Sequence, residues 1–146
     1  MPATVTAPNE ERRRSIQRQA HPHCFACAPT ATGGLGLEFR VGPGGGIAAD
    51  WNCPAKFQGF DGLMHGGLIA TLLDGAMVHA LFARGVIART AELSVRYRHP
   101  MRPGRPARVA AWLCSHTGPL YCLEAEVSQE GAVRASARGK FMADPA

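Results

Sequence analysis

The sequence predicts a single α+β domain in which a long antiparallel sheet curls around one buried helix. Residues 66–83 are apolar on every side of a helix and include one charged residue, Asp74, so other structure must surround that helix. Beyond residue 85, apolar and polar residues alternate through three or four strand-length segments that tight turns join, and strands joined in this way pair antiparallel. A sheet with one apolar face covers such a helix by wrapping around it. The length of 146 residues suits one domain of this kind.

The first 20 residues are interpreted as a tail and a short helix, and residues 21–146 as the main domain. Residues 1–8 are small and contain Pro, which predicts disorder. Asn9 then precedes two acids and several bases, the order expected of a capped polar helix, because acids favour the positive N-terminal end. Residues 20–34 contain Pro and Gly breakers and are expected to form a loop.

Two short strands are expected before the buried helix. Apolar and polar residues alternate over 35–41, a Gly- and Pro-rich turn occupies 42–46, and the chain returns as a second strand over 47–51. The Gly-rich run is not followed by Gly-Lys-Ser/Thr, so it predicts a hairpin turn rather than a phosphate-binding loop. Residues 52–64 are expected to form a loop that leads into the helix.

The later strands follow the same alternation and bring the predicted sheet to about five or six strands. Their apolar and polar residues alternate over 93–98, 109–113, 121–128 and 133–141. Turns are expected at Pro103-Gly104, Gly118-Pro119 and Glu130-Gly131.

Composition and charge exclude several classes of protein. Hydrophobic residues make up 46% of the chain and charged residues 18%, which excludes wholesale disorder. The net charge is +5, and 14 of the 16 basic residues are Arg, whose planar guanidinium suits carboxylate and phosphate groups. An anionic ligand and an ordinary basic surface both fit this balance. Nucleic-acid binding is not expected, because the bases lack the interleaved aromatic residues of single-strand readers.

We expect a cytoplasmic protein with reduced thiols. The N-terminal segment has no apolar stretch of the kind found in secretory signals, and five cysteines with mixed spacing do not form a disulfide framework. The longest apolar stretch, residues 66–82, is close to membrane length but carries Asp74 and His79. Charge at its centre is costly in lipid, so no membrane span is expected.

The most informative segment is the start of the buried helix, where His65-Gly66-Gly67 precedes Asp74. The first N–H groups of a helix lack partners inside the helix, and glycines let a ligand oxygen approach the backbone closely. Such N–H groups form a receptor for the oxygen that becomes negative during acyl transfer. A buried acid needs either hydrogen-bonding partners or a catalytic role, so Asp74 is a candidate catalytic carboxylate, and an acid satisfied by a neighbouring hydroxyl or Arg is the structural alternative.

The spacing within this segment predicts an oligomer. Gly66 and Asp74 are eight residues apart, roughly 12 Å along a helix axis. One substrate carbonyl cannot contact both Gly66 and Asp74 of the same helix. If both groups act on one substrate, the carboxylate comes from a second copy, and a two-fold dimer then holds two equivalent sites across its interface.

Three blocks of the sequence together resemble the hot-dog-fold thioesterases, in the branch similar to the phenylacetate-pathway (PaaI-like) and human thioesterase-superfamily acyl-CoA hydrolases. The blocks are HGGLIATLLD at 65–74, TAELSVRYRHPMRPGRPARV at 90–109 and ASARGKFM at 135–142. The resemblance covers about residues 24–142. It implies a hot-dog fold and hydrolysis of acyl-CoA thioesters by a dimer or a dimer of dimers, without a cofactor or metal.

The resemblance also implies roles for individual residues. Asp74 would activate water or attack the thioester directly, and Gly66, with Gly67, would supply the N–H groups that receive the oxyanion. Thr90 stands where relatives carry a Ser or Thr that positions the attacking water. His65 is expected to shape the helix start. The polar position that some branches place in the preceding loop falls to Gln58 or Asn52.

Two further groups of side chains leave alternatives open. The first is a set of arginines after the helix, which would either grip the phosphates of coenzyme A or form a solvated strand face: Arg96, Arg98, Arg102, Arg105 and Arg108. The second is the run from His21 to Cys27, which also contains His23 and Cys24. Its Cys-x-x-Cys spacing fits metal binding, redox activity or inert packing, of which packing is favoured because no second Cys-x-x-Cys exists. Relatives have Gly at the position of Ala28.

The chemistry of a thioester agrees with this reading. Thiols ionise near pH 8.5, so a thiolate leaves without a strong general acid, and an oxyanion receptor with one carboxylate suffices. The sequence has no Gly-X-Ser-X-Gly segment to supply a rival Ser nucleophile. The alternatives are a non-catalytic protein that binds acyl-CoA or a lipid-like ligand in the same groove, and a metal-dependent interaction module built on the Cys-x-x-Cys loop.

Overall fold

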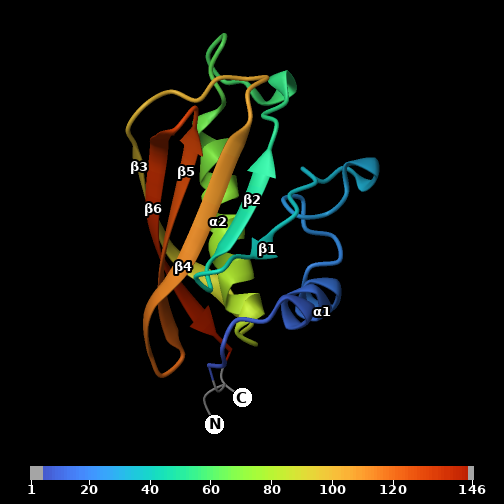
Figure 1. Ribbon diagram of the computed structural model, residues 1–146, viewed down its shortest axis with the longest axis vertical. Coiled ribbons are helices and arrows are strands. Elements are labelled where there is room, and N and C mark those ends of the chain that lie inside the picture. Colours follow the sequence, from blue (N-terminus) through green and yellow to red (C-terminus); the bar gives the residue numbers. More distant parts are fainter. Residues whose placement is uncertain (1–4, 145–146) are drawn as a thin grey trace.

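The computed structural model describes residues 5–144, and its six strands form one antiparallel sheet with the order β1-β2-β4-β5-β6-β3 around a long helix (Figure 1). The helices and strands are α1 (Glu10–Ala20), β1 (Arg40–Val41), β2 (Ile47–Trp51), α2 (Gly66–Ala83), β3 (Ala88–Tyr97), β4 (Ala107–Thr117), β5 (Leu120–Gln129) and β6 (Ala132–Ala143). Two short 3-10 turns, Thr30–Thr32 and Ala55–Phe57, lie in the loops. The predicted α+β architecture is confirmed.

Helix α2 is the centre of the core, and the predicted range is confirmed. It is long and apolar enough to span a membrane by length and composition alone, with a mean hydropathy of 1.5, but 61% of it is buried within the domain. Every residue from Ala76 to Ala83 is buried. In the first half of the helix, Gly67, Ala70 and Asp74 remain partly or fully exposed along one side. The single chain therefore covers α2 completely only at its C-terminal end.

Tight turns join strands β4, β5 and β6, which pair as antiparallel neighbours. Alternate side chains of these strands face α2. Along β5, Leu123, Ala125 and Val127 are buried, while their neighbours point away from the helix. The turn between β5 and β6 has Glu130 at φ 55 and Gly131 at φ 77, the two left-handed residues of a type I′ hairpin. The turns at Gly118-Pro119 and Glu130-Gly131 join strands that pair, as predicted. The expected pairing across Pro103-Gly104 is wrong, because β3 lies at the edge of the sheet beside β6 and does not pair with β4.

The predicted strand over residues 35–41 is wrong in extent. Leu37 and Phe39 are buried in alternation, as predicted, but only Arg40–Val41 pairs with β2. The preceding backbone bonds instead to the loop before it: the Leu35 N–H donates to the Phe25 carbonyl at 2.6 Å. Burial alternation reports which side chains face the core, whereas a ladder also requires backbone bonds to a neighbouring strand, and the N–H groups of residues 35 and 37 bond to the loop at residues 25 and 26 instead.

Helix α1 begins as predicted, because the Asn9 side chain accepts a hydrogen bond from the Arg12 N–H at 2.8 Å. The segment just before it, residues 5–8, differs from the expected disorder: the Thr6 N–H donates to the Arg84 carbonyl at the end of α2. Residues 1–4, for which disorder was also expected, lie outside the described residues. The division of the chain at residue 20 stays a prediction.

A buried polar pair joins the two helices. The Arg13 guanidinium of α1 bonds to the Nδ1 atom of His79 in α2 at 3.0 Å, and it also bonds to Glu10 and Gln17. Because Nδ1 accepts from a guanidinium, the His79 ring is neutral. Burial, followed by the nearby charge of Arg13, lowers the pKa of His79 to about 3.

The neutral ring of His79 predicts a pH-dependent stability. The unfolded chain takes up a proton on this residue below about pH 6.5, while the folded chain resists it down to about 3. Stability is therefore full above that upper value and is lost as the pH falls through this window, by on the order of 1 kcal/mol per pH unit. Urea unfolding of the wild type and of His79→Gln, measured between pH 7 and pH 4, should show a flatter dependence for the variant. Parallel curves would contradict the assignment.

Candidate active site

The start of α2 is held by its cap residue. The backbone carbonyl of His65 accepts from the Ile69 N–H at 3.1 Å, and the His65 Nδ1 atom accepts from the Gly67 N–H at 2.9 Å. A Cβ on Gly67 would lie 3.1 Å from the His65 ring, so glycine leaves room for this cap. The predicted helix-shaping position of His65 agrees with this geometry.

This cap makes the N–H groups of Gly66 and Gly67 different, although the sequence predicted the same role for both. The Gly67 N–H is already bonded to His65, whereas the Gly66 N–H has no hydrogen-bond partner among residues 5–144. Tyr97 of β3 fixes the same turn, because its hydroxyl donates to the Gly66 carbonyl at 2.6 Å. Within the described part of the chain, Gly66 thus presents an unpaired amide at the first position of the helix.

The preceding loop is tied back onto itself by Gln58. Its side chain donates to the Ala55 carbonyl at 2.7 Å and accepts from the Gly62 N–H at 2.6 Å. Gln58 lines a shallow hollow beside His65 and Gly67 at the helix start. Asn52 is exposed after β2 and lines neither this hollow nor the cavity beside Asp74.

Asp74 is the one acidic residue of α2, and its partner comes from the edge strand. The Thr90 hydroxyl of β3 donates to the Asp74 Oδ1 atom at 2.6 Å. Burial raises the pKa of Asp74, the hydrogen bond from Thr90 lowers it in part, and Cys24 nearby raises it further. The structure therefore brings together the two predicted residues Asp74 and Thr90.

A β-bulge turns Thr90 toward the helix. The register of β3 against β6 shifts between Thr90 and Glu92. In a regular strand, residues 90 and 93 point to opposite faces, because side chains alternate. The extra residue lets Thr90 reach Asp74 while Leu93 also lines the inner cavity.

Asp74 opens onto a cavity of about 250 Å³ between α2, β3 and the loop of residues 21–27. Most of the lining is apolar and includes Phe25, Ala70, Val78 and Leu93. An apolar cavity with few polar groups is the usual form of a small-molecule site. Gly67, but not Gly66, is among the lining residues, in keeping with the roughly 12 Å of helix axis that separates Gly66 from Asp74.

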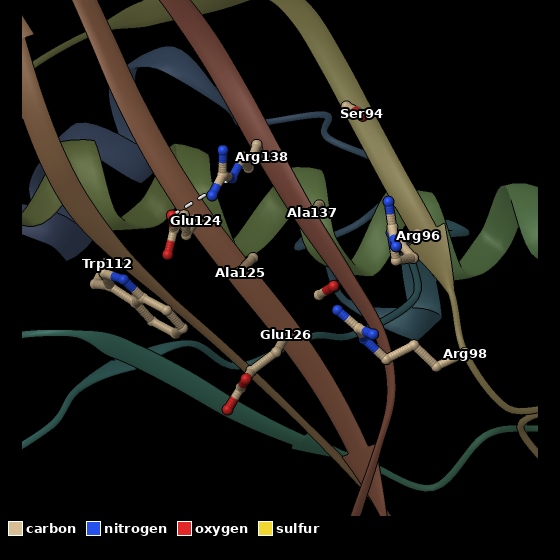
Figure 2. A pocket seen from close by; sticks show the side chains of 10 residues that line it. Ser94, Arg96, Arg98, Trp112, Glu124, Ala125, Glu126, Ala137 and Arg138 are labelled. Atoms are coloured by element: carbon tan, nitrogen blue, oxygen red, sulfur yellow. Dashed lines mark ion pairs between the residues drawn. The ribbon is translucent and has the colours of Figure 1, made fainter.

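The predicted arginine group divides into separate places. Arg96 and Arg98 lie on the outer face of the sheet, away from α2, in a hollow with Glu124, Glu126 and Arg138 (Figure 2). The sheet stands between them and the Asp74 cavity of the same chain.

The other three arginines lie around the following turn. Arg105 pairs with Glu130 at 2.6 Å and Arg108 with Asp50 at 3.3 Å. Arg102 is exposed. Within one chain, the five do not form a single phosphate-binding cluster.

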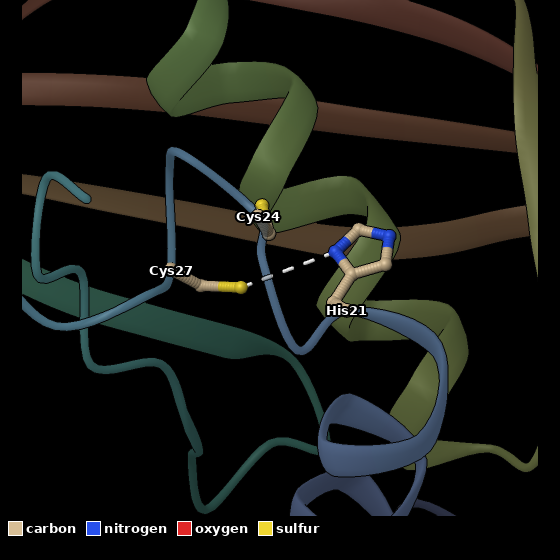
Figure 3. A group of neighbouring side chains, drawn as sticks. All are labelled: His21, Cys24 and Cys27. Carbon is tan, nitrogen blue, oxygen red and sulfur yellow. Dashed lines mark hydrogen bonds between the residues drawn. The ribbon is translucent and has the colours of Figure 1, made fainter. Parts of the chain in front are cut away.

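The convergence of His21, Cys24 and Cys27 is the feature that sequence reasoning undervalued. The three side chains point toward one another (Figure 3), and their ligand-type atoms all lie within 4.8 Å of one another. All three residues line the same cavity as Asp74. The Cys27 Sγ atom lies 3.9 Å from the His21 Nδ1 atom, and the interaction between the two neighbouring thiols lowers the pKa of Cys24 and raises that of Cys27. His23 is exposed and lies outside this group. The signal was present in the Cys-x-x-Cys spacing with a His before it.

Comparison with known proteins places the chain in a family. The sequence profile of the thioesterase superfamily matches residues 61–138, which is just over half of the chain. The chain belongs to the thioesterase superfamily. A comparison with curated proteins gave no match.

Several solved structures have the same fold as this thioesterase-superfamily protein. The PaaI protein of E. coli matches with a TM-score of 0.75 at 19% identity, over 90% of this chain and 98% of that one. A phenylacetic acid degradation-related protein from Ralstonia eutropha matches with a TM-score of 0.72 at 23% identity, over 90% and 98%. The smu.793 protein of Streptococcus mutans, bound to acetyl CoA, matches with 0.69 at 17%, over 74% and 88%. The predicted hot-dog fold and PaaI-like resemblance are thereby confirmed.

The His65 cap leads to a stability prediction. Removing the capping side chain in His65→Ala should lower the free energy of unfolding by about 1 kcal/mol, because the Gly67 N–H loses its partner. His65→Asn is the matched control, since Asn is among the preferred capping residues. Urea unfolding of both variants checks this. Equal losses in the two would show that the cap bond does not stabilise the helix start.

Proposed function

We propose that this protein hydrolyses acyl-CoA thioesters, with the Gly66 amide of one copy and the Asp74 carboxylate of a second copy acting on the same thioester. The observation that carries the proposal is a half-buried carboxylate, held by Thr90, beside an apolar cavity. The superfamily membership and the acetyl CoA bound to the Streptococcus mutans relative support this substrate class.

The reaction requires little from the protein beyond these groups. Asp74 takes a proton from a water molecule as that water attacks the thioester carbonyl, or it attacks the carbonyl itself. The oxygen that becomes negative accepts a hydrogen bond from the Gly66 N–H at the positive end of the helix. Collapse of the tetrahedral adduct breaks the C–S bond and releases coenzyme A as a thiolate. Attack by water gives the carboxylic acid directly, whereas attack by Asp74 leaves an acyl–Asp74 anhydride that a water molecule then hydrolyses to the acid.

Thr90 positions the carboxylate for this step. Its hydroxyl donates to Oδ1, which leaves Oδ2 of Asp74 without a hydrogen-bond partner among the described residues. The same hydrogen bond favours the ionised form of Asp74, which is the form that accepts a proton or attacks a carbonyl.

The exposed edge of β3 and the exposed side of α2 support the proposal of a second copy. Strand β3 is an edge strand of ten residues that pairs only with β6. Tyr97 at its end is 52% exposed, and so is Ile87, just before its start, at 53%. A long free edge of this kind is a template for pairing with another chain. A second copy there would also bury the exposed side of α2 that carries Asp74.

The carboxylate is tested by Asp74→Asn. We expect kcat for hydrolysis of short, medium and aryl-CoA thioesters to fall by about 100-fold or more, since the amide neither takes a proton nor attacks. Asp50→Asn, an exposed acid of β2, is the control and should keep wild-type rates. Equal rates for wild type and Asp74→Asn would remove this residue from the mechanism. Binding of acyl-CoA by the wild type without any turnover would favour the non-catalytic alternative.

The amide is tested by Gly66→Pro. Pro fits the first position of a helix and removes the Gly66 N–H without breaking a hydrogen bond within the helix, and the extended backbone of His65 (φ −63, ψ 134) is compatible with a following Pro. We expect kcat to fall by about 100-fold to 1,000-fold. Gly66→Ala keeps the amide and should remain active, because its Cβ would meet Tyr97 at an ordinary 3.6 Å. An active Gly66→Pro protein would contradict the assignment.

Mixing the two inactive variants tests whether the site is shared. A dimer of one Gly66→Pro chain and one Asp74→Asn chain has one site with both lesions and one intact site, so random exchange should restore about a quarter of wild-type activity. Activity of the mixture is measured after subunit exchange, with each variant alone as control. No recovery in dimers shown to be mixed by mass spectrometry would mean that both groups act within one chain.

A further inference from the structure

The loop that forms one wall of the Asp74 cavity is fixed from both ends. It follows α1 directly: the His21 N–H donates to the Gln17 carbonyl at 2.9 Å, and the Ala28 N–H closes a turn on the Cys24 carbonyl at 2.8 Å. The segment after it adds hydrogen bonds to Phe25 and Ala26 from residues 35 and 37. The backbone thus holds the side chains of His21, Cys24 and Cys27 on one side of the loop.

The spacing of these three side chains is close to that of metal ligands. The Cys27 Sγ atom lies 3.9 Å from the His21 Nδ1 atom, and all three ligand-type atoms lie within 4.8 Å of one another (Figure 3). In a tetrahedral zinc site, with bonds of about 2.3 Å to sulfur and 2.0 Å to nitrogen, neighbouring ligand atoms are about 3.5 to 3.8 Å apart. A side-chain adjustment of about 1 Å would complete that geometry.

We propose that His21, Cys24 and Cys27 bind a zinc ion at the wall of the Asp74 cavity. Thiolate sulfur and imidazole nitrogen are ligands typical of zinc, whereas magnesium and calcium prefer oxygen ligands. Two thiolates and a neutral imidazole balance the charge of Zn²⁺. The three side chains come from consecutive turns of one loop, so binding needs no rearrangement of the sheet or of α2.

The surroundings favour a metal over inert packing. Cys27 is 7% exposed, and among the described residues its Sγ atom has a hydrogen-bond contact only with the His21 Nδ1 atom, at 3.9 Å. His79, which lines the same cavity, is 1% exposed and has an Nε2 atom with no hydrogen-bond partner. Its ring centroid lies 6.4 Å from that of His21. Three protein ligands leave a fourth position of the ion for solvent, and a buried polar atom in the same cavity is a suitable partner for such a water.

The direct test is the metal content of the full chain, produced without a histidine tag and purified without chelators. We expect about one zinc per chain by mass spectrometric metal analysis. Cys24→Ser, Cys27→Ser and His21→Asn should each lower the content by about tenfold or more. The matched controls are His23→Asn and Cys122→Ser, which change the same residue types outside the cluster and should retain the metal.

A second measurement covers loss of metal during purification and variants that fold poorly. Wild-type protein, reduced and freed of metal, is titrated with Co²⁺, and its absorption should show thiolate-to-cobalt charge transfer and the strong d–d bands of tetrahedral coordination. Addition of Zn²⁺ should abolish these bands. No zinc in the isolated protein together with no thiolate–cobalt absorption would overturn the proposal, as would equal metal loss in the control variants. These readouts do not depend on thioester hydrolysis, so they succeed or fail separately from the proposed function.

Discussion

Helix α2 must be covered on its sides, and this requirement shapes the whole fold. A helix of this composition is stable in water only when its sides are covered, and hydrophobic burial is the dominant favourable contribution to folding. Strands β4, β5 and β6 cover it from one side, and β2 and β3 extend the sheet around it. One chain nevertheless leaves Gly67, Ala70 and Asp74 partly exposed, so the covering is complete only toward the C-terminal end.

The candidate site lies where that covering stops. Asp74 belongs to a helix that is otherwise free of charge, and its carboxylate meets a hydroxyl from the edge strand rather than a cation. A hydroxyl satisfies one oxygen without neutralising the acid, whereas an Arg or Lys partner would stabilise the carboxylate as a structural ion pair. This environment agrees with the catalytic role proposed for Asp74. The same exposed side of α2 and the free edge of β3 are what a second copy would bury.

The loop of residues 21–27 gives the cavity its opposite wall and joins α1 to the core. Its position depends on contacts far apart in the chain: Arg13 of α1 bonds to His79 of α2, and the Leu35 N–H reaches back to Phe25. These contacts bring two cysteines and a histidine to the cavity that Asp74 also lines. The acid and the sulfur-rich wall are therefore parts of one site in space, although 47 residues separate Cys27 from Asp74 in the sequence.

Local patterns in the sequence were sufficient to predict the buried helix, its start and the long strands, but not the extent of β1. Period-two alternation predicted the long strands, and a uniformly apolar helix predicted the core. The resemblance rested largely on His65-Gly66-Gly67 with Asp74 eight residues after Gly66. All of these are local patterns of side-chain type. Tertiary structure decided which strands had partners and which residues met. A bulge turned Thr90 to Asp74, the His65 ring occupied the Gly67 amide and left Gly66 free, and the sheet separated Arg96 from the cavity. Each of these outcomes depends on the position of a distant segment or on a single extra residue in a strand. The spacing of neighbouring residues in the sequence specifies neither of these two causes.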